Sequence, residues 1–310
     1  MGETCGRILS DAEDINYFLK NALHIDEVYH GEDYSRCIRK LTTAAMVNEH
    51  ITGKDTLSSA GFRLPPYTDD ASRQHLRNII YKELTTKKRP RRDDDIKLGS
   101  GGARPRTSCR RERNAFYVIG LPASGKSEIS NLLSDQFGAI IVDSDFAKRK
   151  FPEYESEYGA SVVHEESSIV TFGGQGKFSQ EPNVLQFALE GGYNVVIPKI
   201  GNARDKVLQF AAGLKQLNYI VHLVLVRLDR EKATQRALFR YDRTGRYVPL
   251  QLIFDVYGND PTITFYDMVM LDENQTFYSY TMLSSDVPKD AKKELLYRSE
   301  RSPITKEILG

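Results

Sequence analysis

The chain has 310 residues, with 43 Lys and Arg against 42 Asp and Glu, so its formal net charge is +1. Apolar residues make up 40% of the sequence and charged residues 27%, which excludes global disorder and leaves enough apolar side chains for a core. A charge near zero excludes nucleic-acid binding through overall charge. The three cysteines are too few and too scattered for a disulfide framework or a zinc knuckle, which favours a reducing compartment.

The sequence also lacks the signals of membrane attachment and secretion. No stretch approaches the roughly 18 consecutive apolar residues that a membrane-spanning helix needs. Glu3, Asp11 and two further acidic residues in the first fifteen positions exclude the apolar region of a signal peptide. Gly6 stands where a myristoylation motif requires Ser or Thr. We therefore expect a cytoplasmic protein with no membrane partner.

Residues 1–86 have the pattern of a small all-helical domain. Asp11 can cap a first helix, a second helix is predicted over residues 33–51, and a third follows the break at Pro65-Pro66. No residue here carries a catalytic signature. The histidines of this region lack the spacing of metal ligands, and we expect them in structural or surface positions: His24, His30, His50 and His75.

The composition changes abruptly over residues 87–113, where a basic run, an acidic triplet and a glycine-rich stretch follow one another. Such charge blocks with few apolar residues predict a flexible charged linker. The basic run could alternatively contact nucleic acid or an acidic partner, but the acidic triplet at 93–95 would screen it. We do not expect nucleic acid as a partner.

From residue 114 the pattern becomes an alternation of strands and helices. Continuous apolar runs at 115–119, 139–142, 195–197 and 220–226 are typical of strands buried on both faces of a parallel sheet. We predict an α/β fold, a P-loop kinase domain over 114–285 whose mostly parallel sheet is flanked by helices. Residues 286–310 are predicted to form a C-terminal helical extension.

A nucleotide-binding motif follows the first of these runs. Residues 120–127 match G-x-x-x-x-G-K-[ST] and lie between a predicted strand and a predicted helix, as a P-loop requires. Backbone N–H groups of such a loop converge on phosphates, Lys126 would reach the β- and γ-phosphates, and Ser127 would bind Mg²⁺. The motif predicts ATP or GTP with Mg²⁺ as cofactors. The nucleotide-binding residues are Gly120, Leu121, Pro122, Ala123, Ser124, Gly125, Lys126 and Ser127.

Two aspartates end the second apolar run. Asp143 and Asp145 would lie in the crevice where open α/β sheets bind ligands. In one interpretation, one of them accepts the proton of an attacking hydroxyl and the other supports the metal. In the other interpretation, both cap the helix that begins near Phe146. The nearby P-loop favours the first, with Asp143 at the metal.

Arginines gather on and after a later predicted helix, at positions 236, 240, 243 and 246. Guanidinium groups can stabilise the charge that phosphoryl transfer spreads over the equatorial oxygens. The alternative is a solvated helix face paired with Asp229 and Glu231. Beside a P-loop, the first interpretation is favoured.

These features together resemble the zeta toxin family of P-loop small-molecule kinases over about residues 115–278. The resemblance rests on the P-loop, on the strand end at 141–145, on the phrase at 191–197 that leads into the third strand, and on the arginine segment ending at 249. It implies that Asp145 is the catalytic base. It also implies that Arg240 and Arg246 clamp the phosphates beside Lys126, with Arg236 as a possible substitute for Arg240.

The resemblance implies a substrate and a partner as well. Zeta toxins phosphorylate the 3′-hydroxyl of the amino sugar of UDP-N-acetylglucosamine, and a small helical antitoxin holds them inactive. The family usually places a Glu after the third strand, whereas this sequence reads Pro198-Lys199. A glycine-rich insertion at 172–177 also departs from the pattern. Candidate substrate-binding residues are His164, Arg236 and Lys199.

Three hypotheses stay open. A kinase of this type can take another acceptor, such as NAD, an antibiotic hydroxyl or a nucleic-acid end, because the fold does not fix the substrate. A nucleotide-binding switch without acceptor chemistry is an alternative from a different functional class. The helical residues 1–86 can act in cis on the kinase, since tethering raises their effective concentration to the order of millimolar, or they can form an unrelated module for partner binding or oligomerisation.

Overall fold

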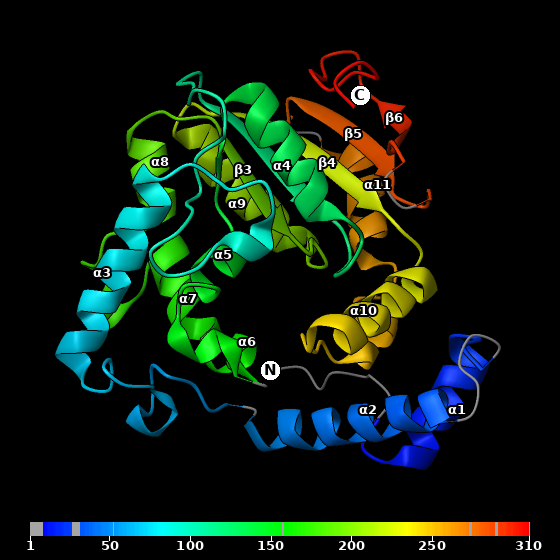
Figure 1. Cartoon of the computed structure of the whole chain (residues 1–310). Helices are drawn as coiled ribbons and strands as arrows, with labels where there is room; N and C mark the ends of the chain where they lie inside the picture. The colour runs from blue at the N-terminus through cyan, green and yellow to red at the C-terminus, as the bar shows by residue number, and fades with distance from the viewer. Residues whose placement is uncertain are drawn as a thin grey trace.

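The computed structural model describes residues 9–26, 32–51, 53–156, 158–272, 275–288 and 291–309. Figure 1 shows a sheet in the upper part of the molecule and the first two helices of the chain along the lower edge of the molecule. The strands are β1 (Asn114–Ile119), β2 (Ile140–Ile141), β3 (Val195–Lys199), β4 (Ile220–Arg227), β5 (Ser279–Ser284) and β6 (Glu294–Arg298). The α-helices are α1 (Ala12–Ala22), α2 (Glu32–Ile51), α3 (Asp70–Thr86), α4 (Lys126–Phe137), α5 (Ser144–Lys148), α6 (Gly159–Val162), α7 (His164–Phe172), α8 (Val184–Glu190), α9 (Arg204–Gln216), α10 (Arg230–Thr244) and α11 (Asp260–Leu271).

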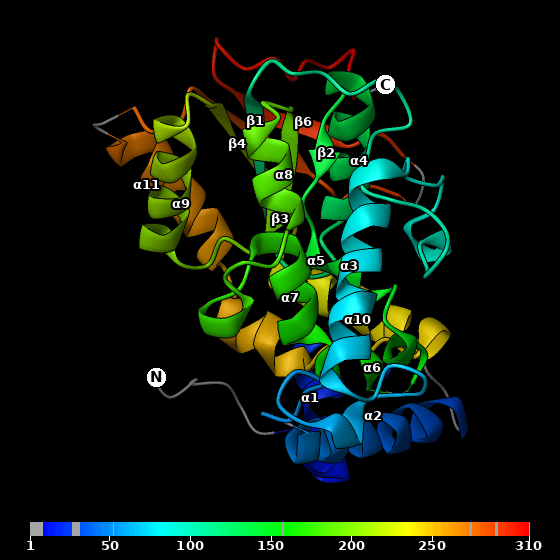
Figure 2. The ribbon, with the colours of Figure 1, turned by 90° about the vertical axis from the view of Figure 1, so that its left-hand side faces the viewer.

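The strands form one sheet in the order β2-β3-β1-β4-β5-β6. Pairing is parallel from β2 to β5, and β6 runs antiparallel to β5. The apolar residues of β1 and β4 are buried because helices cover both faces, with α4 on one side and α9 and α11 on the other (Figure 2). The predicted α/β fold with a mostly parallel sheet and preceding helices is confirmed.

The three N-terminal helices form where the sequence predicts them but do not pack as one unit. Asp11 caps α1 by accepting a hydrogen bond from the backbone N–H of Asp14 at 2.8 Å. Helix α3 adds Leu76, Ile80 and Leu84 to the core of the sheet. Helices α1 and α2 instead bury their apolar faces against α10 in a second hydrophobic cluster.

A buried ionic network attaches α3 to the rest of the fold. The guanidinium of Arg73 donates to Glu153 and Glu166, and that of Arg77 donates to Glu166 and Glu181. The side chain of Glu181 is partly exposed and the other four are buried, those of Arg73 and Glu166 with no exposed surface at all. Since α7 carries Glu166, the network fixes α7 against α3.

The prediction of a flexible linker over residues 87–113 is wrong. Arg89 is buried and forms an ion pair with Asp135 at 2.8 Å. Ala103 is also buried, and its carbonyl accepts a hydrogen bond from the N–H of Ile141 at 3.0 Å. Charged residues that look solvated in the sequence find partners on the kinase domain, so this segment packs onto the fold.

The predicted C-terminal helical extension at 286–310 is also wrong, since β6 lies within it. This strand pairs with β5, which would otherwise present an unpaired edge.

Cys5, Gly6 and His30 lie outside the described residues. Within the described ranges, no helix has the length and apolar character that crossing a membrane requires.

The buried network generates a prediction about stability. Glu166→Gln leaves Arg73 and Arg77 facing a neutral amide, and we expect it to lower the free energy of unfolding by about 3 kcal/mol. Urea unfolding of the full chain followed by circular dichroism measures this loss. The control is Asp33→Asn, which breaks an exposed ion pair with Arg36 and should change stability by less than about 1 kcal/mol. Equal effects of the two substitutions would contradict the assignment.

Candidate active site

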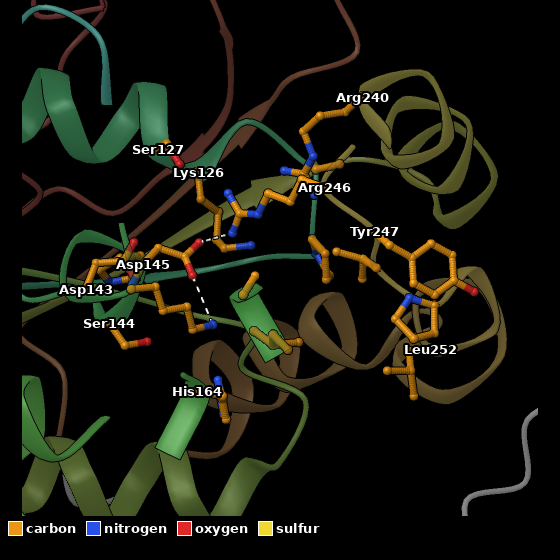
Figure 3. Close-up of a pocket in the computed structure, with 18 of the residues that line it drawn as sticks. Lys126, Ser127, Asp143, Ser144, Asp145, His164, Arg240, Arg246, Tyr247 and Leu252 are labelled. Atoms are coloured by element: carbon orange, nitrogen blue, oxygen red, sulfur yellow. Dashed lines mark hydrogen bonds and ion pairs between the residues drawn. The ribbon is translucent and has the colours of Figure 1, made fainter. Parts of the chain in front are cut away.

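A cavity of about 1220 Å³ lies at the edge of the sheet where β1, β2 and β3 end. The P-loop, the segment from Asp143 to Asp145 and the arginines on and after α10 all line it (Figure 3). The structure therefore brings together residues that the sequence places more than 100 positions apart. An open α/β sheet binds its ligands at this edge.

The P-loop connects β1 directly to α4 and packs tightly against β4. A side chain at Gly120 would place its Cβ 2.6 Å from the carbonyl oxygen of Val226, so only glycine fits there. Gly125 has a φ of 87° and precedes the first turn of α4. This left-handed conformation turns the chain into the helix, whose N-terminal N–H groups then face the cavity.

Lys126 is held by its own loop. Its Nζ donates to the carbonyl oxygens of Gly120 at 2.8 Å and of Leu121 at 2.7 Å. Burial lowers the pKa of Lys126 to about 8, although the nearby carboxylates of Asp143 and Asp145 favour its charged form. The ammonium thus lies at the mouth of the P-loop, close to two carboxylates.

The two aspartates have different surroundings. Asp143 is the N-cap of α5, and its side chain accepts from the N–H of Asp145 at 2.9 Å. Of the two aspartates that the sequence offers as caps, Asp143 therefore caps the helix and Asp145 lies in its first turn. Burial and the charge of Asp145 raise the pKa of Asp143 to about 6.

The Asp145 carboxylate faces the cavity between two cations. It pairs with the guanidinium of Arg246 and, at 3.2 Å, with Nζ of Lys148 (Figure 3). Burial favours the neutral carboxyl, but Arg246 and Lys148 outweigh it and hold the pKa of Asp145 well below its usual range. Asp145 is therefore ionised in this arrangement and only weakly basic.

Two further arginines of α10 border the cavity in different ways. Figure 3 shows the Arg240 side chain extending toward Arg246 and Lys126. The buried Nε of Arg240 has no hydrogen-bond partner among the described residues, and burial lowers the pKa of the Arg240 guanidinium to about 10. Arg236 donates to the carbonyl oxygen of Ser285 at 2.8 Å, which ties it to the end of β5. Arg240 thus keeps donors available for an anionic ligand.

The remaining candidates lie on the α7 side of the cavity. His164 begins α7, and partial burial together with the charge of Lys148 lowers its pKa. Lys199 ends β3, with its Nζ 3.4 Å from the centroid of the Phe172 ring. Burial lowers the pKa of Lys199 to about 8. Both residues line the same cavity as Asp145.

The sequence does not predict the cavity residues that lie outside the kinase motifs. Asn48, Lys54 and Asp55 line the cavity from the end of α2 and the segment after it. Lys293 lines it from the C-terminal region and pairs with Glu128 of α4 at 2.8 Å. No motif marks these positions, because only the folded chain places them beside the P-loop.

The donor set at the P-loop fits Mg²⁺. The Ser127 hydroxyl and the Asp143 carboxylate are hard oxygen donors on the cavity wall, and a cation would relieve the cost of a buried charge on Asp143. The described residues contain no group of three or more His, Cys, Asp or Glu side chains that could enclose a metal. Mg²⁺ bound here would complete its shell with water and phosphate oxygens.

Comparison with known proteins adds to this geometry. Residues 103–263, more than half of the chain, match the zeta toxin family. The chain belongs to the zeta toxin family. The matched region begins within residues 87–113, in agreement with the packing of that segment onto the kinase domain. No match was found among the curated proteins.

Several solved structures match the chain at low sequence identity. A chain from the PezAT toxin–antitoxin system of Streptococcus pneumoniae is 19% identical, with a TM-score of 0.50 over 78% of this chain and 86% of that chain. A putative kinase from Chloroflexus aurantiacus is 15% identical, with a TM-score of 0.34 over 47% and 76%. A chain of the AvrRxo1-ORF1:-ORF2 complex with ATP is 15% identical, with a TM-score of 0.43 over 74% and 67%. At these identities, the likeness to the PezAT chain shows the fold alone.

Proposed function

We propose that this zeta toxin family protein transfers the γ-phosphoryl group of ATP or GTP to a hydroxyl group of a small molecule. The observation that carries the proposal is that a single cavity is lined by Lys126, by Asp145 and by the arginines Arg240 and Arg246. Phosphoryl transfer needs positioning and charge stabilisation, together with a group that accepts the hydroxyl proton. A pure nucleotide switch has no need of that last group.

The donor phosphates would bind between the P-loop and α10. Backbone N–H groups of the loop and of the first turn of α4 would hold the β-phosphate, and Lys126 would exchange its bonds to the loop carbonyls for phosphate oxygens. The Nε of Arg240 has no hydrogen-bond partner among the described residues and supplies a buried donor on the opposite side. When bound to Ser127 and Asp143, Mg²⁺ would neutralise charge on the phosphates.

The ion pair between Asp145 and Arg246 would connect donor binding to base strength. A γ-phosphate competes with Asp145 for the Arg246 guanidinium, because both are anions within the same cavity. Loss of this pairing raises the pKa of Asp145 toward its usual value and makes the carboxylate a better proton acceptor. Asp145 would then take the proton of the acceptor hydroxyl as that oxygen attacks the γ-phosphorus.

UDP-N-acetylglucosamine is the leading acceptor, by family membership. We place it on the α7 side of Asp145, where His164 and Lys199 line the cavity, with Arg236 nearer the donor. A volume of about 1220 Å³ exceeds the roughly 300–1,000 Å³ of a typical small-molecule site, which favours two ligands bound together. NAD and other hydroxyl compounds remain as alternative acceptors.

The direct test is product analysis with the full chain. The protein is incubated with γ-labelled ATP or GTP, Mg²⁺ and either UDP-N-acetylglucosamine or a metabolite extract. Mass spectrometry then searches for a product one phosphoryl group heavier. Lys126→Ala serves as the inactive control, since it removes the ammonium that contacts the phosphates. Absence of a phosphorylated product with every acceptor would favour the nucleotide switch.

The base assignment makes a kinetic prediction. We expect Asp145→Asn to lower kcat by about 10²–10⁴-fold without raising the KM for ATP, because the P-loop holds the phosphates and a neutral amide competes less with them for Arg246. Steady-state kinetics of labelled product measures both constants. The control is Asp94→Asn, which removes an exposed carboxylate paired with Arg149 outside the cavity. An unchanged kcat with weakened ATP binding would transfer the base role to Asp143.

We further propose that the N-terminal helices restrain the enzyme in cis, in addition to or in place of a separate antitoxin. Lys40 of α2 pairs with Asp242 of α10 at 2.8 Å. Beyond α2, the N–H of Thr56 donates to the carbonyl oxygen of Val162 in α6 at 2.9 Å. The segment between these anchors includes Asn48 and Lys54, which line the cavity, and α2 runs along the lower edge of the molecule (Figures 1 and 2).

A single charge reversal tests this restraint while preserving α3 in the core. Lys40→Glu replaces the ion pair with a repulsion against Asp242 and loosens α2 from α10. We expect kcat/KM to rise on the order of two- to five-fold, the range that an exposed ion pair allows. An unchanged or reduced kcat/KM in a stably folded variant would show that α2 does not restrain the enzyme.

A further inference from the structure

Lys199 occupies a position next to the proposed reaction centre. It is the last residue of β3 and pairs in register with Ile119, the residue that precedes the P-loop. On its other side β3 pairs with β2, which leads to Asp143 and Asp145. Lys199 therefore lies at the same sheet edge as the groups that would handle the phosphates, and its side chain lines the cavity.

Within the described ranges, no carboxylate forms an ion pair with the Lys199 ammonium, although Asp143 lies near enough to favour its charge. The ammonium also forms no hydrogen bond with any described residue, and its Nζ lies over the face of the Phe172 ring, 3.4 Å from the ring centroid. Burial destabilises the charge and lowers the pKa of Lys199 to about 8, with Asp143 as the group that favours the charged form. A half-buried cation with an aromatic ring on one side can accept an anion on the other.

Several other cations of the cavity already have partners. Lys148 and Arg246 pair with Asp145, Lys126 bonds to its own loop, and Lys293 pairs with Glu128. Lys199 acts instead on His164, whose pKa its positive charge helps to lower. In Figure 3, His164 lies apart from Arg240 and Arg246. Lys199 thus belongs to the α7 side, where the acceptor is placed.

We propose that Lys199 is a specificity-determining residue that binds an anionic phosphate group of the acceptor. The inference rests on the proposed kinase function and narrows its substrate class to hydroxyl compounds that carry a phosphate or a pyrophosphate. The ammonium forms a charge-assisted hydrogen bond to that group, while Asp145 faces the hydroxyl that reacts. Sugars and nucleosides without a phosphate lack this contact and bind more weakly.

The test uses matched acceptors with and without a phosphate. The pairs are UMP with uridine, AMP with adenosine, and N-acetylglucosamine 1-phosphate with N-acetylglucosamine, with UDP-N-acetylglucosamine and NAD as larger probes. Full-length wild type, Lys199→Met and Lys199→Arg are compared in the same assay. The control is Lys206→Met, which removes an exposed lysine of α9 that does not line the cavity.

We expect wild type to favour the phosphate-bearing member of at least one pair. Lys199→Met should raise the KM for that member by about 10–100-fold, the effect of losing one charge-assisted hydrogen bond. The KM for its uncharged partner and for ATP should stay unchanged, and Lys199→Arg should retain most of the preference. An equal loss for both members, a loss confined to ATP, or no preference in wild type would overturn the proposal.

A binding measurement separates failure of this inference from failure of the kinase assignment. Calorimetric titration of the same pairs, with the β,γ-imido analogue of ATP present in saturating amount, reports acceptor affinity without turnover. Tighter binding of the phosphate-bearing member by wild type, lost in Lys199→Met, supports the anion site even if no acceptor is phosphorylated. Phosphorylation of an acceptor together with equal affinities in the two proteins overturns the anion site and keeps the kinase.

Discussion

Parallel pairing of β1, β2 and β3 holds the ends of three strands at one edge of the sheet, and the whole candidate site depends on this constraint. The P-loop follows Ile119, Asp143 lies two residues beyond β2, and Lys199 ends β3. The register pairs Ile119 with Lys199, so the phosphate-binding loop starts beside the backbone of Lys199. A slip of β3 by one residue would turn Lys199 to the opposite face of the sheet and remove it from the cavity.

The ion pair between Asp145 and Arg246 joins the two halves of the cavity. One partner stands on the short helix after β2, and the other follows α10, 101 positions later in the chain. The pairing keeps the proposed base weak, since Arg246 and Lys148 hold the pKa of Asp145 well below its usual range. If a phosphate of the phosphoryl donor competes for Arg246, the pKa of Asp145 rises only when that donor is bound. Asp145 would then act as a base only when a phosphoryl donor is present.

Segments outside the matched family region stabilise and border this site. The family match begins at residue 103, yet α3 supplies core residues and the buried arginines that hold α7. Helix α2 is attached to α10 at Lys40 and leads into the cavity-lining residues after it. Removal of all residues before the kinase motif would expose the apolar core residues that α3 covers, and it would leave Glu153 and Glu166 without Arg73. The N-terminal region is therefore part of the folding unit.

The sequence by itself determined the local elements: the strand, loop and helix of the P-loop, the buried parallel strands, and the Asp11 cap of α1. These features depend on periodicity and on contacts within a few residues. The packing of residues 87–113, the pairing of β6 and the partner of Asp145 were decided only by the tertiary structure. Charged residues such as Arg89 look solvated in a sequence, because their partners lie tens of residues away. Burial with such a partner is a property of the assembled fold, and no local pattern encodes it.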